Sequence, residues 1–356
     1  MTVYACLACG ERLPLAPAHR CERCGGSYSL PDGITLRRDT IDPRAPGIWR
    51  YRDSFGLPED SPVLTLGEGN TPLVAVQLFG QELMLKLESC NPTGSYKDRL
   101  AAVMVSDLVG RGVTGAVEDS SGNAGAAFAA YAARAGMAAK VFVPQSASGP
   151  KRSQIERFGA EIVTVPGPRQ AAADAVMEAV WQGAVYASHA YLPQGLTGVA
   201  TIAYELVDDL GQPPGAVLAP AGHGGLLLGI ALGFQALKEA GEIESLPDLV
   251  GVQALNNAPL WAAAGGSKPS FGTTAAEGIA VTQPARMTEL LALHQRGVVR
   301  FAAVKEPHIH SGRTALSRLG IDAEPTSAVV WDAFRQTRQT LTPPVVAVIS
   351  GHGLKA

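Results

Sequence analysis

Lys97 stands in a sequence context that favours Schiff-base chemistry. Residues 91–99 (NPTGSYKDR) place one lysine at the end of a Pro/Gly turn, where an amphipathic helix is expected to begin. Asp98 then falls in the first helical turn, where the helix dipole favours a negative charge. The backbone directs a lysine at such a junction, and this is the placement that an ε-amine needs to meet a cofactor aldehyde. For this residue taken alone, a solvated loop lysine is the alternative.

Two further segments have the character of anion sites. Residues 120–125 (SSGNAG) and 222–226 (GHGGL) each follow a short apolar stretch and open a predicted helix. Free backbone N–H groups and the helix dipole at such a position attract an anion, and glycines let it approach closely. Each loop alone could be an ordinary tight turn. One lysine and two such loops in this order are much less expected by chance than any one of them alone.

Four of the five cysteines lie near the N-terminus, as the pairs Cys6/Cys9 and Cys21/Cys24. Two CxxC pairs supply four thiolates that can close a tetrahedron around zinc, and four protein ligands make such a zinc structural. Disulfides and a ribbon that has lost its metal are the alternatives. Cys90 stands apart from the pairs, and no functional role is expected for it, since free cysteines usually serve as small hydrophobic residues.

Short apolar stretches alternate with helical periodicity from residue 84 onward. This alternation predicts an α/β fold with parallel sheets, in which ligands bind at the carboxyl ends of the strands. The predicted strands are residues 84–87, 115–118, 140–143, 162–165, 216–219, 250–253, 299–304 and 345–349. The predicted helices are residues 98–108, 123–135, 153–158, 169–181, 201–210, 226–239, 285–293, 308–319 and 327–340. His308 and His310 are expected to lie in a polar helix start rather than in a metal site.

The composition limits the classes of function. The 356 residues are 46% apolar and 17% charged, so we expect a large buried core. The formal net charge of −3 gives no support for a nucleic-acid partner. The N-terminus lacks the pattern of a signal peptide, and no apolar run reaches the roughly 18 residues of a membrane span. A soluble, cytoplasmic protein without a membrane partner is therefore expected.

The lysine turn and the two loops together resemble the fold-type II pyridoxal-phosphate enzymes, and within them the threonine synthase branch. Residues 67–73 (GEGNTPL), 324–328 (EPTSA) and 350–355 (SGHGLK) also match, so the resemblance runs from about residue 45 to the C-terminus. It implies two doubly wound parallel-sheet domains behind a zinc-ribbon-like module. The expected ranges are 1–30 for the module, 105–195 for the smaller domain, and 31–104 with 196–356 for the larger, cofactor-binding domain.

The same resemblance implies a role for each site residue. Lys97 would form the Schiff base with pyridoxal 5'-phosphate (PLP) and move protons at the substrate Cα. The other cofactor-binding residues would be Asn123 at the ring hydroxylate, Gly222, His223, Gly224, Gly225 and Leu226 at the phosphate, and Ser350 at the pyridine nitrogen. The substrate carboxylate would be held by Ser120, Ser121, Gly122 and Ala124. The metal ligands would be Cys6, Cys9, Cys21 and Cys24.

The resemblance implies a lyase that acts on a small amino acid such as O-phosphohomoserine. Residues 195–201 carry no lysine or arginine for the phosphate of that substrate, although Lys151 and Arg152 are candidates. Residues 277–280 (EGIA) resemble a loop of the related dehydratases. A threonine or serine dehydratase-like ammonia-lyase, a β-replacement enzyme and a non-catalytic PLP-binding interaction protein therefore stay open, as does a homodimer.

Overall fold

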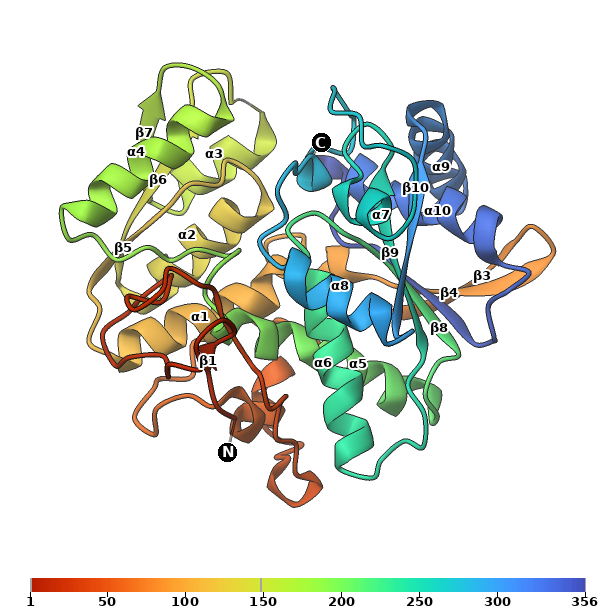
Figure 1. Ribbon diagram of the computed structural model, residues 1–356, viewed down its shortest axis with the longest axis horizontal. Coiled ribbons are helices and arrows are strands. Elements are labelled where there is room, and N and C mark those ends of the chain that lie inside the picture. The colour runs from red at the N-terminus through yellow and green to blue at the C-terminus, as the bar shows by residue number, and fades with distance from the viewer. Residues whose placement is uncertain (1, 148, 356) are drawn as a thin grey trace. The chain divides into compact units, whose positions relative to one another are not determined.

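The computed structural model describes residues 2–147 and 149–355 and divides into two compact units (Figure 1). The first unit contains Met1–Gly69, Asn91–Thr93 and Lys97–Gly198. The second contains Asn70–Cys90, Gly94–Tyr96 and Val199–Ala356. The predicted domain boundaries stay a prediction. They differ from these units chiefly for residues 31–69 and for the helix that begins at Lys97, which group with the first unit.

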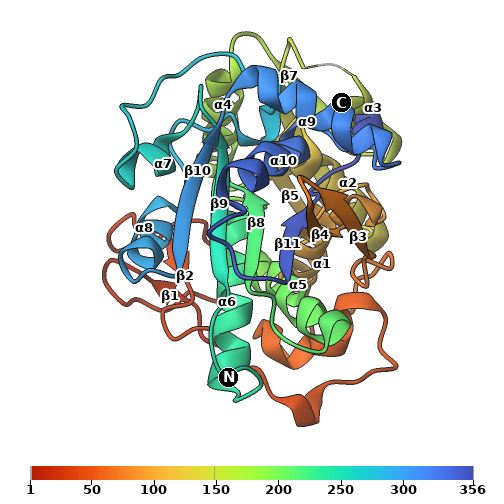
Figure 2. The ribbon, with the colours of Figure 1, turned by 90° about the vertical axis from the view of Figure 1, so that its right-hand side faces the viewer.

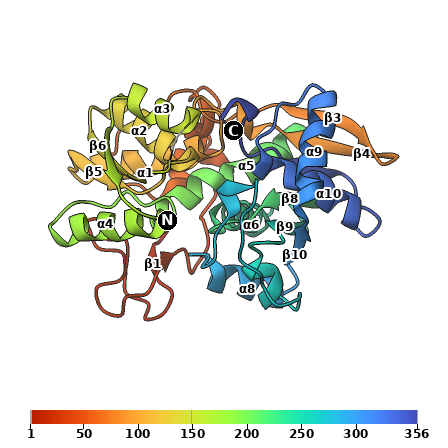
Figure 3. The same cartoon turned by 90° about the horizontal axis from the view of Figure 1, so that it is seen from above.

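The first unit is built on a parallel three-stranded sheet. Its strands β5 (Gly115–Glu118), β6 (Ala138–Pro144) and β7 (Glu161–Val165) lie in the order β5-β6-β7. Helix α4 (Arg169–Trp181) covers one face, and α2 (Asn123–Ala135) and α3 (Pro150–Arg157) cover the other (Figure 3). Helix α1 (Lys97–Gly110) packs against α2. The prediction of an α/β fold with parallel sheets is confirmed.

The second unit is built on a six-stranded sheet in the order β10-β9-β8-β11-β4-β3 (Figure 2). Its strands are β3 (Leu73–Leu78), β4 (Gln81–Lys86), β8 (Ala216–Pro220), β9 (Asp248–Ala254), β10 (Val299–Val304) and β11 (Val345–Val348). Every neighbouring pair is parallel except β3 and β4, which form an antiparallel hairpin. Phe79 and Gly80 form its turn with φ of 52° and 75°, the left-handed region that a tight hairpin requires. The predicted strands did not include β3.

Helices cover both faces of this sheet. Helices α6 (Gly225–Glu239) and α8 (Met287–Gln295) lie on one face, and α9 (Glu306–Arg318) and α10 (Pro325–Thr337) on the other. Leu218 and Val250 pack in a cluster with Val329 and Phe334 of α10. A Cβ on Gly251 would instead lie 2.7 Å from Leu227 of α6. Because both faces are covered, β8 is buried throughout and β9 is buried after its first residue, Asp248.

Shorter elements complete the described chain. They are β1 (Ala5–Cys6), β2 (Tyr28–Ser29), η1 (Arg38–Thr40), η2 (Gly47–Phe55), η3 (Glu88–Cys90), α5 (Gln194–Leu210), α7 (Pro259–Ala263), η4 (Glu277–Ile279) and η5 (Gly353–Lys355). The connector after the cysteine module is fixed to the first unit by Trp49, whose Nε1 donates to Glu68 Oε1 at 2.9 Å. None of the helices in the described ranges combines the length and apolar character needed to cross a bilayer.

Candidate active site

Lys97 is the first residue of α1 and is half-buried. The carboxylate of Asp98, itself fully buried, accepts a hydrogen bond from the backbone N–H of Thr93 at 2.9 Å. Asn91 Oδ1 accepts another from the backbone N–H of Gly69 at 3.0 Å. These bonds fix the chain around the turn, so the backbone sets the direction in which Lys97 leaves the helix, as its sequence context predicts.

The loop of residues 120–125 joins the end of β5 to the start of α2. The backbone N–H of Gly122 donates to Ser120 Oγ at 3.2 Å. A Cβ on Gly125 would lie only 1.9 Å from the carbonyl oxygen of Ser120, so glycine is required for the loop to fold onto its helix. Residues 120–123 are half-buried, while Ala124 is buried. The half-buried residues thus lie at the N-terminus of a helix, where the dipole favours an anion.

The loop of residues 222–226 joins β8 to α6. A Cβ on Gly222 would lie 3.0 Å from the carbonyl oxygen of Gly278. Gly224 has φ of +95°, and its Cβ would lie 2.6 Å from Leu290 Cδ1. The backbone N–H of Arg286 donates to the carbonyl of His223 at 3.0 Å, which holds the loop from outside. A glycine-rich turn, packed closely against its neighbours, therefore precedes this helix N-terminus, an arrangement suited to a phosphate group.

Ser350 follows β11, the strand next to β8 in the same sheet. Because β8 and β11 are parallel, Ser350 and Gly222 lie beyond the carboxyl ends of adjacent strands. Ser350 is buried, and its Oγ lies 3.0 Å from Ser327 Oγ. Ser327 Oγ also accepts the backbone N–H of Gly351 at 2.9 Å, so the serine pair is fixed. The second unit thus places the predicted phosphate loop and Ser350 at the carboxyl-terminal end of two adjacent strands of one sheet.

A family described as "Pyridoxal-phosphate dependent enzyme" matches residues 64–351. The chain belongs to this family of pyridoxal-phosphate-dependent enzymes. It is 33% identical over 319 residues to a threonine synthase of Synechocystis sp., covering 86% of this chain and 82% of the relative. It is 29% identical over 374 residues to a threonine synthase of Methanocaldococcus jannaschii, covering 98% of this chain and 92% of the relative. The resemblance to the threonine synthase branch is confirmed at this level.

Solved structures show the fold of these PLP-dependent enzymes in the chain. Maize serine racemase superposes with a TM-score of 0.68 at 20% identity, covering 80% of this chain and 88% of the racemase. A threonine deaminase from T.th. superposes with a TM-score of 0.67 at 25% identity, covering 79% of this chain and 92% of the deaminase.

The residues present fit the family's cofactor. Gly222 and Gly224 let the loop pack closely against residues 278–279, 286 and 290, and the loop offers backbone N–H groups at the start of a long helix. A fixed, buried hydroxyl stands beyond the adjacent strand at Ser350.

Residues 195–201 have a packing role in the structure. The helix predicted for 201–210 begins earlier, at Gln194, so the whole segment lies in α5. A Cβ on Gly195 would lie 2.4 Å from Leu100 Cγ, and one on Gly198 only 2.1 Å from the carbonyl oxygen of Arg99. The glycines of this segment therefore allow α5 to approach α1 closely.

Sequence reasoning passed over three residues of the candidate site. Ser327 belongs to the matched run 324–328 but received no role, and only the structure pairs it with Ser350. Glu118, which is buried, and His189, which is partly buried, form a contact of 2.5 Å just before the 120–125 loop. The available signal for Glu118 was two consecutive acids, Glu118 and Asp119, at the end of an apolar strand.

The four N-terminal cysteines converge in the first unit. Their sulfur atoms all lie within 4.8 Å of one another, with Sγ–Sγ distances of 3.5 Å for Cys6–Cys24 and 3.6 Å for Cys9–Cys21. A tetrahedron with zinc–sulfur bonds of about 2.3 Å has sulfurs about 3.8 Å apart. The backbone N–H groups of Gly10 and Gly25 donate to the carbonyls of Cys6 and Cys21 and close the two turns. The cluster can therefore hold a four-coordinate metal ion.

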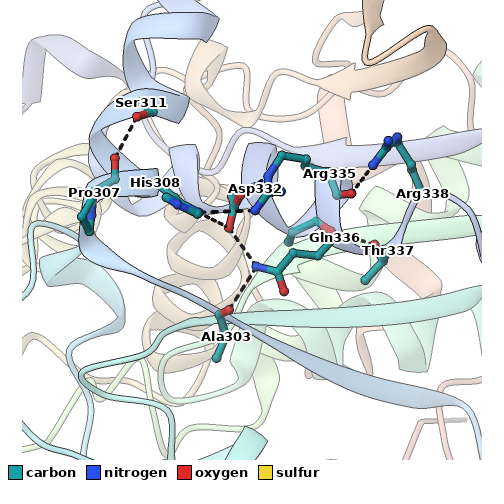
Figure 4. Close-up of polar contacts among 10 residues, drawn as sticks. Ala303, Pro307, His308, Ser311, Asp332, Arg335, Gln336, Thr337 and Arg338 are labelled. Atoms are coloured by element: carbon teal, nitrogen blue, oxygen red, sulfur yellow. Dashed lines mark hydrogen bonds and ion pairs between the residues drawn. The ribbon is translucent and has the colours of Figure 1, made fainter.

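His308 lies in a polar contact between α9 and α10 (Figure 4). Its Nδ1 is 3.0 Å from Asp332 Oδ2, and Arg335 Nε is 2.6 Å from the other oxygen of that carboxylate. Gln336 Nε2 donates to Asp332 Oδ2 at 2.8 Å and also contacts the carbonyl of Ala303. The carboxylate thus ties the two helices together, and the prediction that His308 lies in a polar helix start is confirmed.

Proposed function

We propose that this protein is a PLP-dependent lyase that removes a leaving group from the side chain of a small amino acid. The observation that carries the proposal is the position of Lys97, at the first residue of α1 in a chain about one-third identical to threonine synthases. Bound PLP would supply an electron sink for bond breaking at the substrate Cα. Lys97 would hold the cofactor aldehyde and then accept the Cα proton.

The remaining residues of the proposed site would bind and orient the cofactor and the substrate. Gly222, His223, Gly224, Gly225 and Leu226 would bind the cofactor phosphate through backbone N–H groups. Asn123 would donate to the ring hydroxylate. The loop members Ser120, Ser121, Gly122 and Ala124 would hold the substrate carboxylate. Ser350, fixed by Ser327, would place a neutral hydroxyl at the pyridine nitrogen, which suits elimination better than transamination.

Two substrates are candidates. The first is O-phosphohomoserine, because curated relatives over most of the chain are threonine synthases. The second is a hydroxy amino acid such as threonine or serine. One argument for the second candidate is that residues 195–201 form a closely packed helix without lysine or arginine. Another is that the chain shares its fold with a threonine deaminase.

Assaying both kinds of substrate for both products tests the proposal. Phosphohomoserine turnover releases phosphate, whereas deamination of threonine releases ammonia and a 2-oxo acid. Phosphate release would identify the first candidate, and ammonia release the second. Stoichiometric PLP binding without turnover of either would instead indicate a non-catalytic binding protein.

For the cysteine cluster we propose structural zinc, because four thiolates leave no coordination position open for chemistry. Metal analysis of protein purified under reducing, oxygen-free conditions should give about one zinc per chain. Fresh, reduced protein without bound metal would count against this assignment.

A further inference from the structure

Five polar side chains gather at the carboxyl end of β5, directly before the loop of residues 120–125. They are Glu118, Asp119, Arg169, Tyr186 and His189, and both carboxylates are buried. The proposed function uses none of them. Their contacts divide them into two groups: one holds an ion pair, and the other is a pair that can carry a proton.

The first group consists of Asp119, Tyr186 and Arg169, and in it the negative charge of Asp119 is balanced by Arg169. Asp119 accepts the hydroxyl of Tyr186 at 2.7 Å and lies 2.8 Å from Arg169 Nη2. Burial alone would raise the pKa of Asp119, but the charge of Arg169 and the Tyr186 hydrogen bond outweigh it and lower that pKa. Asp119 is therefore an anion, and Arg169 is committed to it.

Glu118 and His189 form the second group. Glu118 Oε1 lies 2.5 Å from His189 Nδ1, and Glu118 Oε2 accepts the backbone N–H of Asp119 at 2.7 Å. Burial, and then the charge of Asp119, raise the pKa of Glu118 well above its ordinary value. Burial, and then the charge of Lys97, lower the pKa of His189 well below its ordinary value. Both shifts favour a neutral pair, with one proton in the Nδ1–Oε1 contact and another on Nε2.

Backbone hydrogen bonds hold His189 at this place. The N–H of Val117 donates to the carbonyl of Val185 at 2.8 Å, and the N–H of Ala187 donates to the carbonyl of Val117 at 2.9 Å. Residues 185–187 thus extend alongside β5, and His189 follows at the strand end that opens the 120–125 loop. His189 thereby lies beside the loop that is proposed to hold the substrate carboxylate.

We propose that His189, backed by Glu118, donates a proton to a hydroxyl leaving group, so that the substrate is a small hydroxy amino acid. This inference rests on the proposed lyase function and names its substrate class. A phosphate or chloride leaves as a stable anion, whereas a hydroxyl group must be protonated as it leaves. Arg169, the cation of this cluster, is already paired with Asp119 at 2.8 Å, so the cluster offers no uncommitted positive charge of its own to a substrate phosphate.

The proton balance of this step closes within the named groups. The Cα–H bond breaks and Lys97 takes its proton. The electron pair of that bond forms the Cα=Cβ bond as the Cβ–O bond breaks, and the leaving oxygen takes the Nε2 proton of His189 to become water. The proton of Glu118 moves to Nδ1, which leaves a neutral imidazole and a carboxylate. The carboxylate charge appears as Lys97 becomes positive, so each change stabilises the other.

Leaving-group dependence tests the proposal. PLP-loaded parent, His189→Gln and Glu118→Gln proteins are assayed with L-serine, L-threonine, β-chloro-L-alanine and O-phosphohomoserine, and 2-oxo acid and phosphate are measured. His189→Gln should lower kcat on serine and threonine by about 100-fold or more, the usual size of general acid catalysis. Its loss on β-chloroalanine should be at least about 10-fold smaller, because chloride needs no proton. Glu118→Gln should show the same selectivity with a smaller loss, and it serves if His189→Gln folds poorly.

The control is His310→Gln, which changes an exposed histidine on α9. It should leave both substrate classes unaffected. An equal loss of His189→Gln on serine and β-chloroalanine, or no loss on serine, would overturn the proton-donor role. Parent protein that releases phosphate from phosphohomoserine but does not act on hydroxy amino acids would overturn the substrate class. Parent protein that acts on β-chloroalanine alone would support the lyase function but overturn the proposed substrate class. Parent protein that acts on none of the substrates would overturn both the lyase function and this inference.

Discussion

The ring of His19 lies against the ring of Tyr186, with centroids 5.4 Å apart and planes at 64°. His19 precedes Cys21 in the cysteine module, and the hydroxyl of Tyr186 is bonded to Asp119 at the start of the 120–125 loop. The neighbouring Arg20 lies over the ring of Tyr191, 4.5 Å from its centroid. The cysteine module therefore packs on the segment that carries His189.

Loss of metal from the cysteine module should perturb the 120–125 loop and so weaken substrate binding. We expect that Cys6→Ser/Cys21→Ser removes the metal, lowers Tm, and raises KM for the amino acid, because the His19–Tyr186 contact is loosened. His19→Ala should reproduce the KM effect while keeping the metal, at a cost of about 1 kcal/mol in stability. Zinc content, Tm and KM are the measurements. Arg23→Ala, an exposed change in the same module, is the matched control, and an unchanged KM in both test variants would show that the module is independent of the site.

Lys97→Ala should abolish covalent attachment of the cofactor. After borohydride reduction, intact mass measurement should find one phosphopyridoxyl group on the parent chain and none on the variant, because borohydride attaches the cofactor only where an amine has formed a Schiff base with it. Turnover should be lost as well. Lys140→Ala is the control, since Lys140 is exposed and pairs with Glu161 at 3.0 Å, a contact worth less than about 1 kcal/mol. Equal fixation in parent and Lys97→Ala proteins would assign the cofactor to another lysine.

Gly125→Ala should disrupt the 120–125 loop. Its Cβ would lie 1.9 Å from the carbonyl oxygen of Ser120, so the loop or α2 must shift. We expect a loss of about 1–3 kcal/mol in stability and a rise in KM larger than any fall in kcat. Gly115→Ala in β5 is the control, because its nearest new contact is an ordinary 3.4 Å. Thermal unfolding and steady-state kinetics provide both readouts, and a variant with parental Tm and KM would contradict the required close approach.

Asp332→Asn should weaken the α9–α10 contact in a pH-dependent way. Burial raises the pKa of Asp332, but Arg335, Gln336 and His308 outweigh it and lower that pKa. A carboxyl with a lowered folded pKa stabilises the protein above its unfolded pKa of about 4 and loses this effect as pH falls through the folded pKa. The variant should be less stable than the parent by about 1–3 kcal/mol near pH 7.

The difference should shrink as the pH approaches 3. Tm values measured from pH 7 to pH 3 check the trend. Glu239→Gln, an exposed change on α6, should show no such convergence. A constant difference between parent and Asp332→Asn across this range would mean that the carboxylate charge does not stabilise the helix pair.

Local signals in the sequence determined much of this protein. The Pro/Gly turn predicted a helix start at Lys97, and the apolar run before residue 120 predicted β5 with its observed bounds. The two CxxC pairs predicted a four-cysteine cluster, whose sulfurs the structure brings together. These features follow from residues close in sequence, where backbone sterics, capping and short spacings decide the outcome.

Long-range contacts required the tertiary structure. Strand β3 pairs with β4, and Gly195 and Gly198 allow the helix through residues 195–201 to pack closely on α1. Glu118 and His189 are 71 positions apart and meet only because residues 185–187 hydrogen-bond to β5. The sequence by itself determined the cofactor family and the residues proposed to hold it. The folded chain alone decided which buried groups surround them, because protonation and packing depend on neighbours that no local pattern encodes.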